Sequence, residues 1–148
     1  YNNIYGPRQG FKHVIPQFIK RAYFKVDTFQ IYGAKQTRAF CYIDDAVEAT
    51  AKLALVEEKG IFNIGNDEYE MLIMNLAEKV VEKFNYSPKF EIKKPPEGSV
   101  HRRCPDTSLL RKTIDFTPKY NIDFGLDKTI EWYSHYYSNN DIPSSQFL

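Results

Sequence analysis

The order of apolar and polar positions along the chain predicts helices that alternate with short strands. Residues 14–24 carry apolar side chains three or four positions apart, which is the spacing of an amphipathic helix. Short apolar runs that end at glycine or proline predict strands instead. Helices are predicted at 14–24, 46–59, 72–84, 107–113 and 124–137, and strands at 29–32, 39–43, 61–65 and, as an edge strand, 89–93. This alternation predicts an α/β fold.

Cap and turn residues set the ends of several elements. Asp44 or Asp45 is suited to cap the second helix, which Gly60 would end. The stretch Pro95–Gly98 is predicted to be a rigid loop. Residues 138–148 are typical of a polar C-terminal tail.

The first ten residues, YNNIYGPRQG, have the pattern of a strand that is leaving a sheet. Ile4 and Tyr5 favour a strand, and the Gly6-Pro7 pair ends it. Because a chain rarely starts at the end of a strand, we expect this sequence to be a piece of a longer protein.

The composition indicates a globular protein without a strong overall charge. The chain has 148 residues, 43% of them hydrophobic, and a formal net charge of +1. Such a charge creates no long-range field that would attract nucleic acid or an anionic membrane, so anion binding has to come from local arginines. No apolar run is long enough to cross a bilayer and no signal leader opens the chain, which favours a cytoplasmic protein.

The sequence carries none of the common self-contained catalytic motifs. It has no G-x-G-x-x-G, Walker, HExxH or G-x-S-x-G sequence. Cys41 and Cys104 lack metal-ligand spacing, so we interpret them as buried or half-buried thiols. The histidines have no nucleophile or orienting carboxylate at a recognisable spacing, and we interpret His13, His101 and His135 as surface or packing residues. We expect neither a catalytic residue nor a metal site in this chain.

Arginines beside aromatic residues are the feature that points to a ligand. Arg38 opens a predicted strand, and Arg102 and Arg103 follow the proline-rich loop. Arginine donates two hydrogen bonds at once from a planar fork, which suits a diphosphate. Tyr32 or Phe29 offers a flat ring on which a nucleobase could stack. On spacing alone, the alternative is that these are solvated arginines and core aromatics.

A series of short motifs, in order and with compatible gaps, resembles a known enzyme family. The motifs are N-x-Y-G-P (3–7), V-I-P-x-F-I (14–19), I-Y-G (31–33), Q-T-R-A-F-x-Y-I-D-D (36–45), F-N-I-G-N (62–66), R-x-P-D (103–106) and G-L-x-x-T-I-E-W (125–132). Together they resemble the C-terminal half of extended short-chain dehydrogenase/reductases, the NAD-dependent epimerases, dehydratases and decarboxylases of nucleotide sugars. The stretch 36–40 is most similar to the UDP-glucuronate decarboxylase branch.

The resemblance implies a division of labour within a longer protein. In the family an N-terminal Rossmann half holds NAD and the catalytic Tyr-x-x-x-Lys group, and a C-terminal half closes over the nucleoside-diphosphate sugar. Residues 1–137 would then be the substrate-binding region, with residues 1–7 similar to the end of a Rossmann strand. NAD would be bound by the missing half, the chain would be inactive alone, and the full-length protein would be a homodimer.

The resemblance also implies roles for individual residues. Asn3 is similar to the family's amide ligand of the sugar and diphosphate, and Tyr32 lies in the strand that borders the base. Arg38 and Arg103 match the arginines that hold the diphosphate, with Arg102 as a neighbouring substitute. The alternative function is a non-catalytic module that binds nucleotide sugars or serves as a scaffold.

Overall fold

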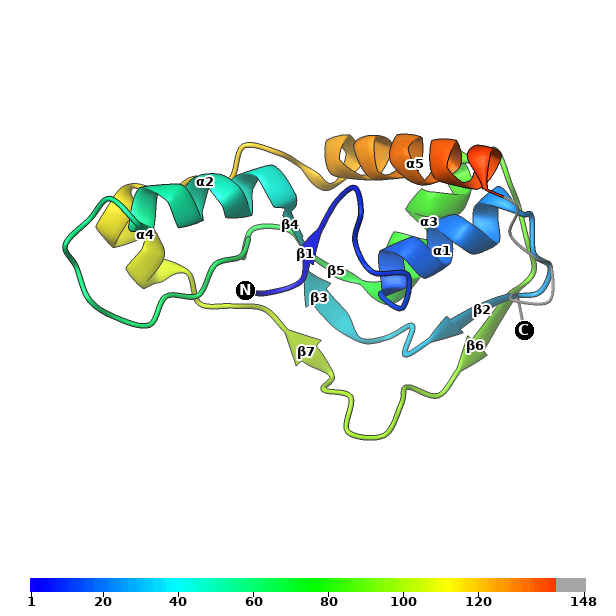
Figure 1. Ribbon diagram of the computed structural model, residues 1–148. Coiled ribbons are helices and arrows are strands. Elements are labelled where there is room, and N and C mark those ends of the chain that lie inside the picture. Colours follow the sequence, from blue (N-terminus) through cyan, green and yellow to red (C-terminus); the bar gives the residue numbers. More distant parts are fainter. Residues whose placement is uncertain (141–148) are drawn as a thin grey trace.

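The computed structural model describes residues 1–140 as a mixture of helices and short strands (Figure 1). In chain order the elements are β1 (Ile4–Tyr5), α1 (Val14–Tyr23), β2 (Phe29–Tyr32), β3 (Thr37–Ala39), β4 (Cys41–Tyr42), α2 (Ile43–Leu53), β5 (Glu70–Leu72), α3 (Ile73–Lys83), β6 (Phe90–Lys93), β7 (Arg102–Arg103), α4 (Ser108–Ile114) and α5 (Ile122–Asn139). The predicted α/β class is confirmed.

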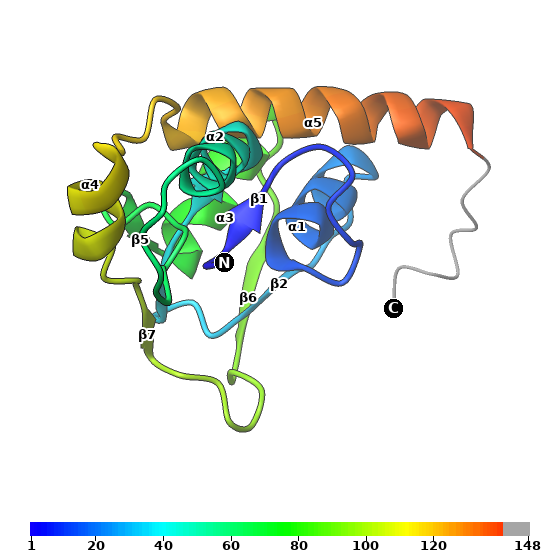
Figure 2. The same ribbon diagram turned by 60° about the vertical axis from the view of Figure 1, so that its left-hand side comes forward.

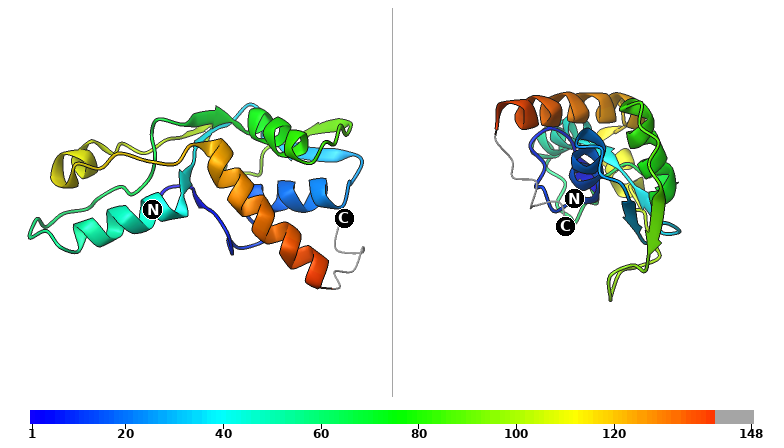
Figure 3. Two further views of the ribbon diagram at one scale, coloured as in Figure 1. Left: turned by 90° about the horizontal axis from the view of Figure 1, so that it is seen from above. Right: turned by 90° about the vertical axis from the view of Figure 1, so that its right-hand side faces the viewer.

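The main core lies where α1, α3 and α5 pack together over the parallel pair β2–β6. Figure 1 shows α5 along the top of the molecule, above α1 and α3, and Figure 3 shows it crossing them diagonally. The α1 helix buries a stripe of Ile15, Phe18, Ile19 and Ala22, as its spacing predicts. Pro16 is tolerated because it lies in the first turn, where its missing N–H has no carbonyl to bond.

A smaller core lies at the opposite end of the molecule, between α2 and α4. Figure 2 shows these two helices next to each other, below the start of α5. This core buries Ala49 of α2 and Leu110 of α4 together with Cys41 and Phe116. Cys41 is fully buried and Cys104 is half-buried, and both are free thiols, as predicted.

The α5 helix approaches the pair β1–β4 closely because residue 125 is glycine. A Cβ atom placed on Gly125 would collide with the ring and hydroxyl of Tyr5 and would lie 2.9 Å from Tyr42. The two tyrosines sit next to each other on β1 and β4, which are paired in parallel with Tyr5 opposite Tyr42. Gly125 therefore allows a helix and two aromatic side chains to occupy adjoining space.

A three-stranded sheet in the order β5-β3-β7 carries Arg38, Arg102 and Arg103. The central strand β3 runs antiparallel to β5 and parallel to β7. Thr37 is opposite Arg102, and Arg38 is opposite Arg103. Because side chains alternate between the two faces of a sheet, Arg38 and Arg103 share one face, and Thr37 and Arg102 share the other.

The structure differs from two predictions about α2, the position of its C-terminal end and the identity of its N-cap. The helix ends at Leu53 rather than near Gly60, and its N-cap is Tyr42, without a side-chain cap. Leu55, just beyond the end of the helix, is 86% exposed, so burial of its side chain does not extend the helix. The prediction that Asp44 or Asp45 caps the helix is wrong, because both lie inside its first turn.

Other differences concern strands. The predicted strand at 61–65 is absent; this segment is joined to the rest of the described chain by one backbone bond, from Asn2 N–H to the Ile64 carbonyl at 2.8 Å. The strand predicted at 39–43 is interrupted at Phe40 and gives way to α2 at Ile43. The strands β5 and β7 were not predicted. The tail predicted at 138–148 begins inside α5, and residues 141–148 lie outside the described residues.

Candidate functional site

Arg38 and Arg103 form a pair of like charges on the strands β3 and β7. Their register places them side by side, and the charge of Arg103 helps to lower the pKa of Arg38, after the larger effect of burial. Within residues 1–140 the Arg103 side chain forms no hydrogen bond or ion pair, and no carboxylate contacts either guanidinium. Two adjacent cations without a counter-ion are a favourable place for an anion with two charges.

The two arginines lie on the wall of a cleft of about 490 Å³ between β3, α1 and the end of β2. Four of its lining side chains are permanent cations: Lys12, Arg21, Arg38 and Arg103. The remaining lining residues are Asn3, His13, Val14, Gln17, Phe18, Tyr32, Gln36, Phe40, Ile73 and Pro96, and none of the lining residues is an aspartate or glutamate. A wall of this charge attracts anions and repels cations.

The guanidinium of Arg38 is held by several acceptors from its own strand and from the loop before β7. One terminal nitrogen, Nη1, donates to the Thr37 carbonyl at 2.7 Å, and the other, Nη2, donates to the Val100 carbonyl at 3.0 Å. Nη2 also donates to Gln36 Oε1 at 2.9 Å. The Nε–H is left without an acceptor among residues 1–140. Arg38 therefore offers its charge and one N–H group, whereas Arg103 offers its whole fork.

Asn3 lies on the cleft wall at the start of β1. Its backbone is left-handed, with φ of 46°, and its Nδ2 donates to the Ala39 carbonyl at 2.8 Å. This bond ties β1 to the junction of β3 and β4. The Oδ1 atom has no partner among the described residues and can accept a hydrogen bond from a ligand hydroxyl.

Tyr32 stands at the end of β2 with 47% of its surface exposed. Its hydroxyl donates to Gln30 Oε1 at 3.3 Å, and Tyr32 is one of the residues that line the cleft. Behind β2, Arg21 donates to the Gln30 carbonyl at 2.6 Å and lies 5.9 Å from the centre of the Phe29 ring. Phe29 itself is fully buried in the core, so of the two rings considered from the sequence only that of Tyr32 is available to a ligand.

Arg102, predicted as a neighbouring substitute for Arg103, does not line the cleft. It lies on the opposite face of the sheet, where its Nε and Nη2 donate to both carboxylate oxygens of Glu70 at 2.9 and 2.7 Å. The hydroxyl of Thr37 binds the same carboxylate at 2.5 Å. These donors lower the pKa of Glu70, with Arg102 as the larger cause. One-residue alternation along β7 thus gives two adjacent arginines different environments.

The cleft is also lined by polar residues other than those predicted from the sequence. Gln17 and Arg21 follow each other by one helical turn on α1, next to its buried stripe, and Lys12 precedes that helix. Gln36 lies two residues before Arg38, which is the spacing of side chains on the same face of a strand. That spacing was present in the sequence and could have identified Gln36.

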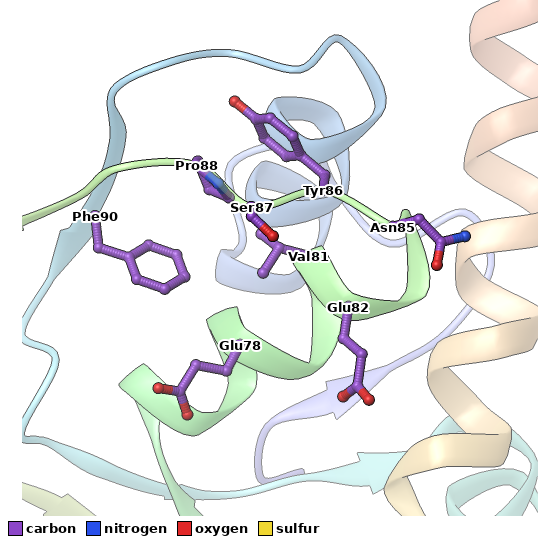
Figure 4. A pocket seen from close by; sticks show the side chains of 8 residues that line it. All are labelled: Glu78, Val81, Glu82, Asn85, Tyr86, Ser87, Pro88 and Phe90. Atoms are coloured by element: carbon purple, nitrogen blue, oxygen red, sulfur yellow. The ribbon is translucent and has the colours of Figure 1, made fainter.

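A second hollow, of about 510 Å³, lies between α3 and β6 and has a different character (Figure 4). Figure 4 shows the ring of Phe90 directed toward α3, and the carboxylates of Glu78 and Glu82 projecting from that helix. These two acids would repel an anionic ligand. None of the residues predicted to bind substrate lines this hollow.

The G-x-G-x-x-G motif does not occur in the sequence, and the parallel strand β4 is not followed by a glycine-rich turn. No group of three His, Cys, Asp or Glu side chains within residues 1–140 is arranged to hold a metal. A dinucleotide needs a glycine-rich turn between a parallel strand and a helix N-terminus. The parallel strand β4 instead runs straight into α2, whose first turn carries Asp44 and Asp45, and two acids at that position would repel a pyrophosphate.

Comparison with known proteins gives related sequences. Residues 1–65 match the NAD dependent epimerase/dehydratase family. The chain is 39% identical over 147 residues to UDP-N-acetyl-alpha-D-glucosaminuronate decarboxylase of Bacillus cytotoxicus, a match that covers 90% of this chain and 44% of that protein. It is 32% identical over 142 residues to UDP-glucuronic acid decarboxylase 1 of Arabidopsis thaliana, covering 94% of this chain and 32% of that protein.

A solved structure with a similar fold is the UDP-glucose 4-epimerase of Thermotoga maritima with UDP-glucose. The TM-score is 0.85 and the identity 26%, over 92% of this chain and 45% of that chain. The present chain thus spans less than half the length of the proteins it matches. Among the described residues, no helix combines the length and apolarity needed to span a membrane.

Proposed function

Because the chain belongs to the NAD dependent epimerase/dehydratase family, we propose that it is the C-terminal, substrate-binding half of an enzyme that acts on a nucleoside-diphosphate sugar. The family uses NAD. In this proposal NAD is held by the remainder of the protein, together with the groups that perform the chemistry. The enzyme would be a cytoplasmic homodimer.

The observation that carries the proposal is the unneutralised pair Arg38–Arg103 on the wall of a cleft whose lining includes four cations and no aspartate or glutamate. A diphosphate carries two adjacent negative groups and accepts hydrogen bonds on every peripheral oxygen, so it complements two adjacent guanidinium groups. Arg103 would supply two parallel N–H bonds from its free fork. Arg38 would supply its charge and its Nε–H.

The other lining residues can hold the two ends of such a ligand. Asn3 Oδ1 would accept a hydrogen bond from a sugar hydroxyl. The exposed ring of Tyr32 would cover one face of the base, because a flat π-system stacks on an aromatic side chain. Both relatives described above are decarboxylases of UDP-linked uronic acids, which supports a UDP-uronate as substrate and decarboxylation as reaction.

The proposal is tested by titrating UDP into the natural polypeptide that contains residues 1–148, here called the intact protein. Replacing Arg38 or Arg103 by alanine should weaken UDP binding by about tenfold to a hundredfold, because a hydrogen bond to a charged group contributes about 1.5 to 3 kcal/mol. Arg8→Ala is the matched control, since Arg8 is exposed and outside the cleft lining. NAD binding should change in none of the three variants.

Two outcomes separate this proposal from its alternatives. Unchanged UDP affinity in both Arg38→Ala and Arg103→Ala would remove the diphosphate site. Retained UDP affinity in an intact protein that binds no NAD and converts no UDP-sugar would favour the non-catalytic binding module.

A further inference from the structure

The side chain of Gln36 lies at the junction of the cleft wall, Arg38 and the loop that precedes β7. It is 8% exposed, and its Oε1 accepts hydrogen bonds from Arg38 Nη2 and from Ser99 Oγ, both at 2.9 Å. Its Nε2 donates to the Ser99 carbonyl at 3.4 Å. Since an arginine can only donate, the amide oxygen has to face Arg38, which fixes the orientation of the amide group.

The backbone of Gln36 is fixed as firmly as its side chain. Its N–H donates to the Gly33 carbonyl at 2.8 Å, and its carbonyl accepts from Ile73 N–H at 2.9 Å. Gly33 is left-handed, with φ of 66°, and a Cβ atom there would lie 2.7 Å from Gln36 Oε1. The missing side chain at Gly33 therefore makes room for the amide that contacts Arg38.

Gln36 also connects Arg38 to the segment between β6 and β7. The chain between β6 and β7 projects away from the rest of the molecule in Figures 1 and 2. Its end is attached through Ser99 and Val100, which bind Gln36 and Arg38. The same segment leads directly into Arg103 on β7.

We propose that Gln36 is a positioning residue for the diphosphate site: its neutral amide oxygen holds one guanidinium nitrogen of Arg38 without cancelling the charge of the Arg38–Arg103 pair. This inference rests on the proposed function, because it concerns the same ligand. A neutral acceptor matters here. A carboxylate at position 36 would also hold Arg38, but as an ion pair, and it would compete with the phosphate for the same cation.

The experiment compares two variants of Gln36 in the intact protein. Gln36→Glu keeps the acceptor and adds a negative charge, whereas Gln36→Met keeps the length and removes the acceptor. UDP affinity should fall at least tenfold in Gln36→Glu and only a few-fold in Gln36→Met. The melting temperature should rank the other way, because the glutamate gains an ion pair with Arg38 and the methionine leaves that guanidinium nitrogen with one acceptor fewer.

If Gln36 had only a structural role, the variant with the lower melting temperature would also bind UDP more weakly. The proposed role predicts the opposite: Gln36→Glu has the higher melting temperature and the lower UDP affinity. The salt dependence of UDP binding should also become shallower in Gln36→Glu, because one cation is neutralised, and stay unchanged in Gln36→Met. Asn75→Asp is the matched control: it makes the same amide-to-carboxylate change at an exposed position of α3 outside the cleft lining, and its affinity should equal that of the wild type.

The outcomes separate the inference from the function on which it rests. If Arg38→Ala loses UDP but Gln36→Glu binds as tightly as Asn75→Asp, the positioning role is wrong and the diphosphate site stands. If Arg38→Ala and Arg103→Ala bind UDP normally, the diphosphate site itself is wrong. Should Gln36→Glu not fold, Gln36→Met decides, and wild-type affinity in that variant overturns the role of Gln36.

Discussion

Arg38 on β3 lies directly opposite Arg103 on the parallel strand β7, and no carboxylate within residues 1–140 neutralises either side chain. Folding brings the two charges together at a cost, which burial of Arg38 increases. An arrangement that places like charges side by side on a cleft wall is expected where an anion completes it.

The first prediction concerns the shape of the cation rather than its charge. In Arg103→Lys the positive charge remains but the planar fork is lost, so UDP affinity should recover only partly from the loss in Arg103→Ala. Arg38→Lys should recover less, because a lysine ammonium cannot reproduce the bonds to Thr37, Gln36 and Val100. Calorimetric titration of UDP into the four variants measures this. Full recovery by lysine at both positions would show that charge alone matters.

The second prediction concerns Arg102, which lies next to Arg103 in sequence but on the opposite face of β7. Arg102→Ala should leave UDP affinity within about twofold of the wild type, because the guanidinium is bound to Glu70 and does not line the cleft. The same titration includes Arg103→Ala as the positive control. If Arg102→Ala reduced UDP affinity as much as Arg103→Ala, the face of β7 that carries Arg102 would have to contact the ligand in the bound state.

The sequence was sufficient to locate the elements whose apolar faces are buried within the chain. Helices α1, α3 and α5 and the strands β2 and β6 lie close to their predicted ranges, because Ile19, Leu76, Val80 and Leu126 bury themselves against each other at the predicted spacing. The prediction of a strand at 61–65 is wrong, because this segment lacks a paired strand among the described residues. An apolar run becomes a strand only where a neighbouring strand supplies backbone partners, and Asn2 supplies one.

Part of the lining of the candidate cleft follows from the sequence, and the rest depends on tertiary pairing. The sequence identified Asn3, Tyr32, Arg38 and Arg103, which the fold brings to one cleft. It could not separate Arg102 from Arg103, since β7 is defined by its pairing with β3 rather than by its own residues. It also missed Arg21, because a cation on the flank of an amphipathic helix resembles any solvated residue until β2 is placed beside it.

The third prediction concerns acid stability and the link between α4 and the loop before β5. Asp67 is buried in part, which opposes ionisation, but hydrogen bonds from Arg111 at 2.6 Å and from Thr107 at 2.8 Å outweigh this and lower its pKa. A carboxyl whose pKa is lower in the folded state stabilises the fold above its ordinary pKa of 3.8 and loses that contribution as the pH falls below it.

The variant Asp67→Asn should therefore be less stable than the wild type at pH 7, and the difference should shrink between about pH 4 and pH 2. Urea unfolding at a series of pH values measures both effects. Asp44→Asn is the control, since Asp44 has no hydrogen bond or ion pair within residues 1–140. A difference between Asp67→Asn and the wild type that stays constant down to pH 2 would contradict the assigned cause.

The last prediction concerns the close approach of α5 to β1 and β4. Alanine normally stabilises a helix relative to glycine by up to about 1 kcal/mol, so a Gly→Ala change inside α5 would be favourable if there were room. At Gly125 there is none, because the new methyl group would overlap the Tyr5 side chain, which is 2% exposed and cannot move into solvent. Gly125→Ala should instead destabilise the protein by about 1 to 3 kcal/mol, the usual cost of overpacking.

Gly60→Ala is the matched control for Gly125→Ala. A Cβ atom on Gly60 would meet only the Phe62 ring, at ordinary contact distances of 3.6 and 3.7 Å, and its stability should change by less than about 0.5 kcal/mol. A second test removes the Tyr5 side chain that the new methyl group would meet. In a Tyr5→Leu background, Gly125→Ala should lower the free energy of unfolding much less, because the ring and hydroxyl are gone. Equal costs in both backgrounds would show that Tyr5 is not what requires glycine at position 125, and that α5 is held close to β4 by other contacts.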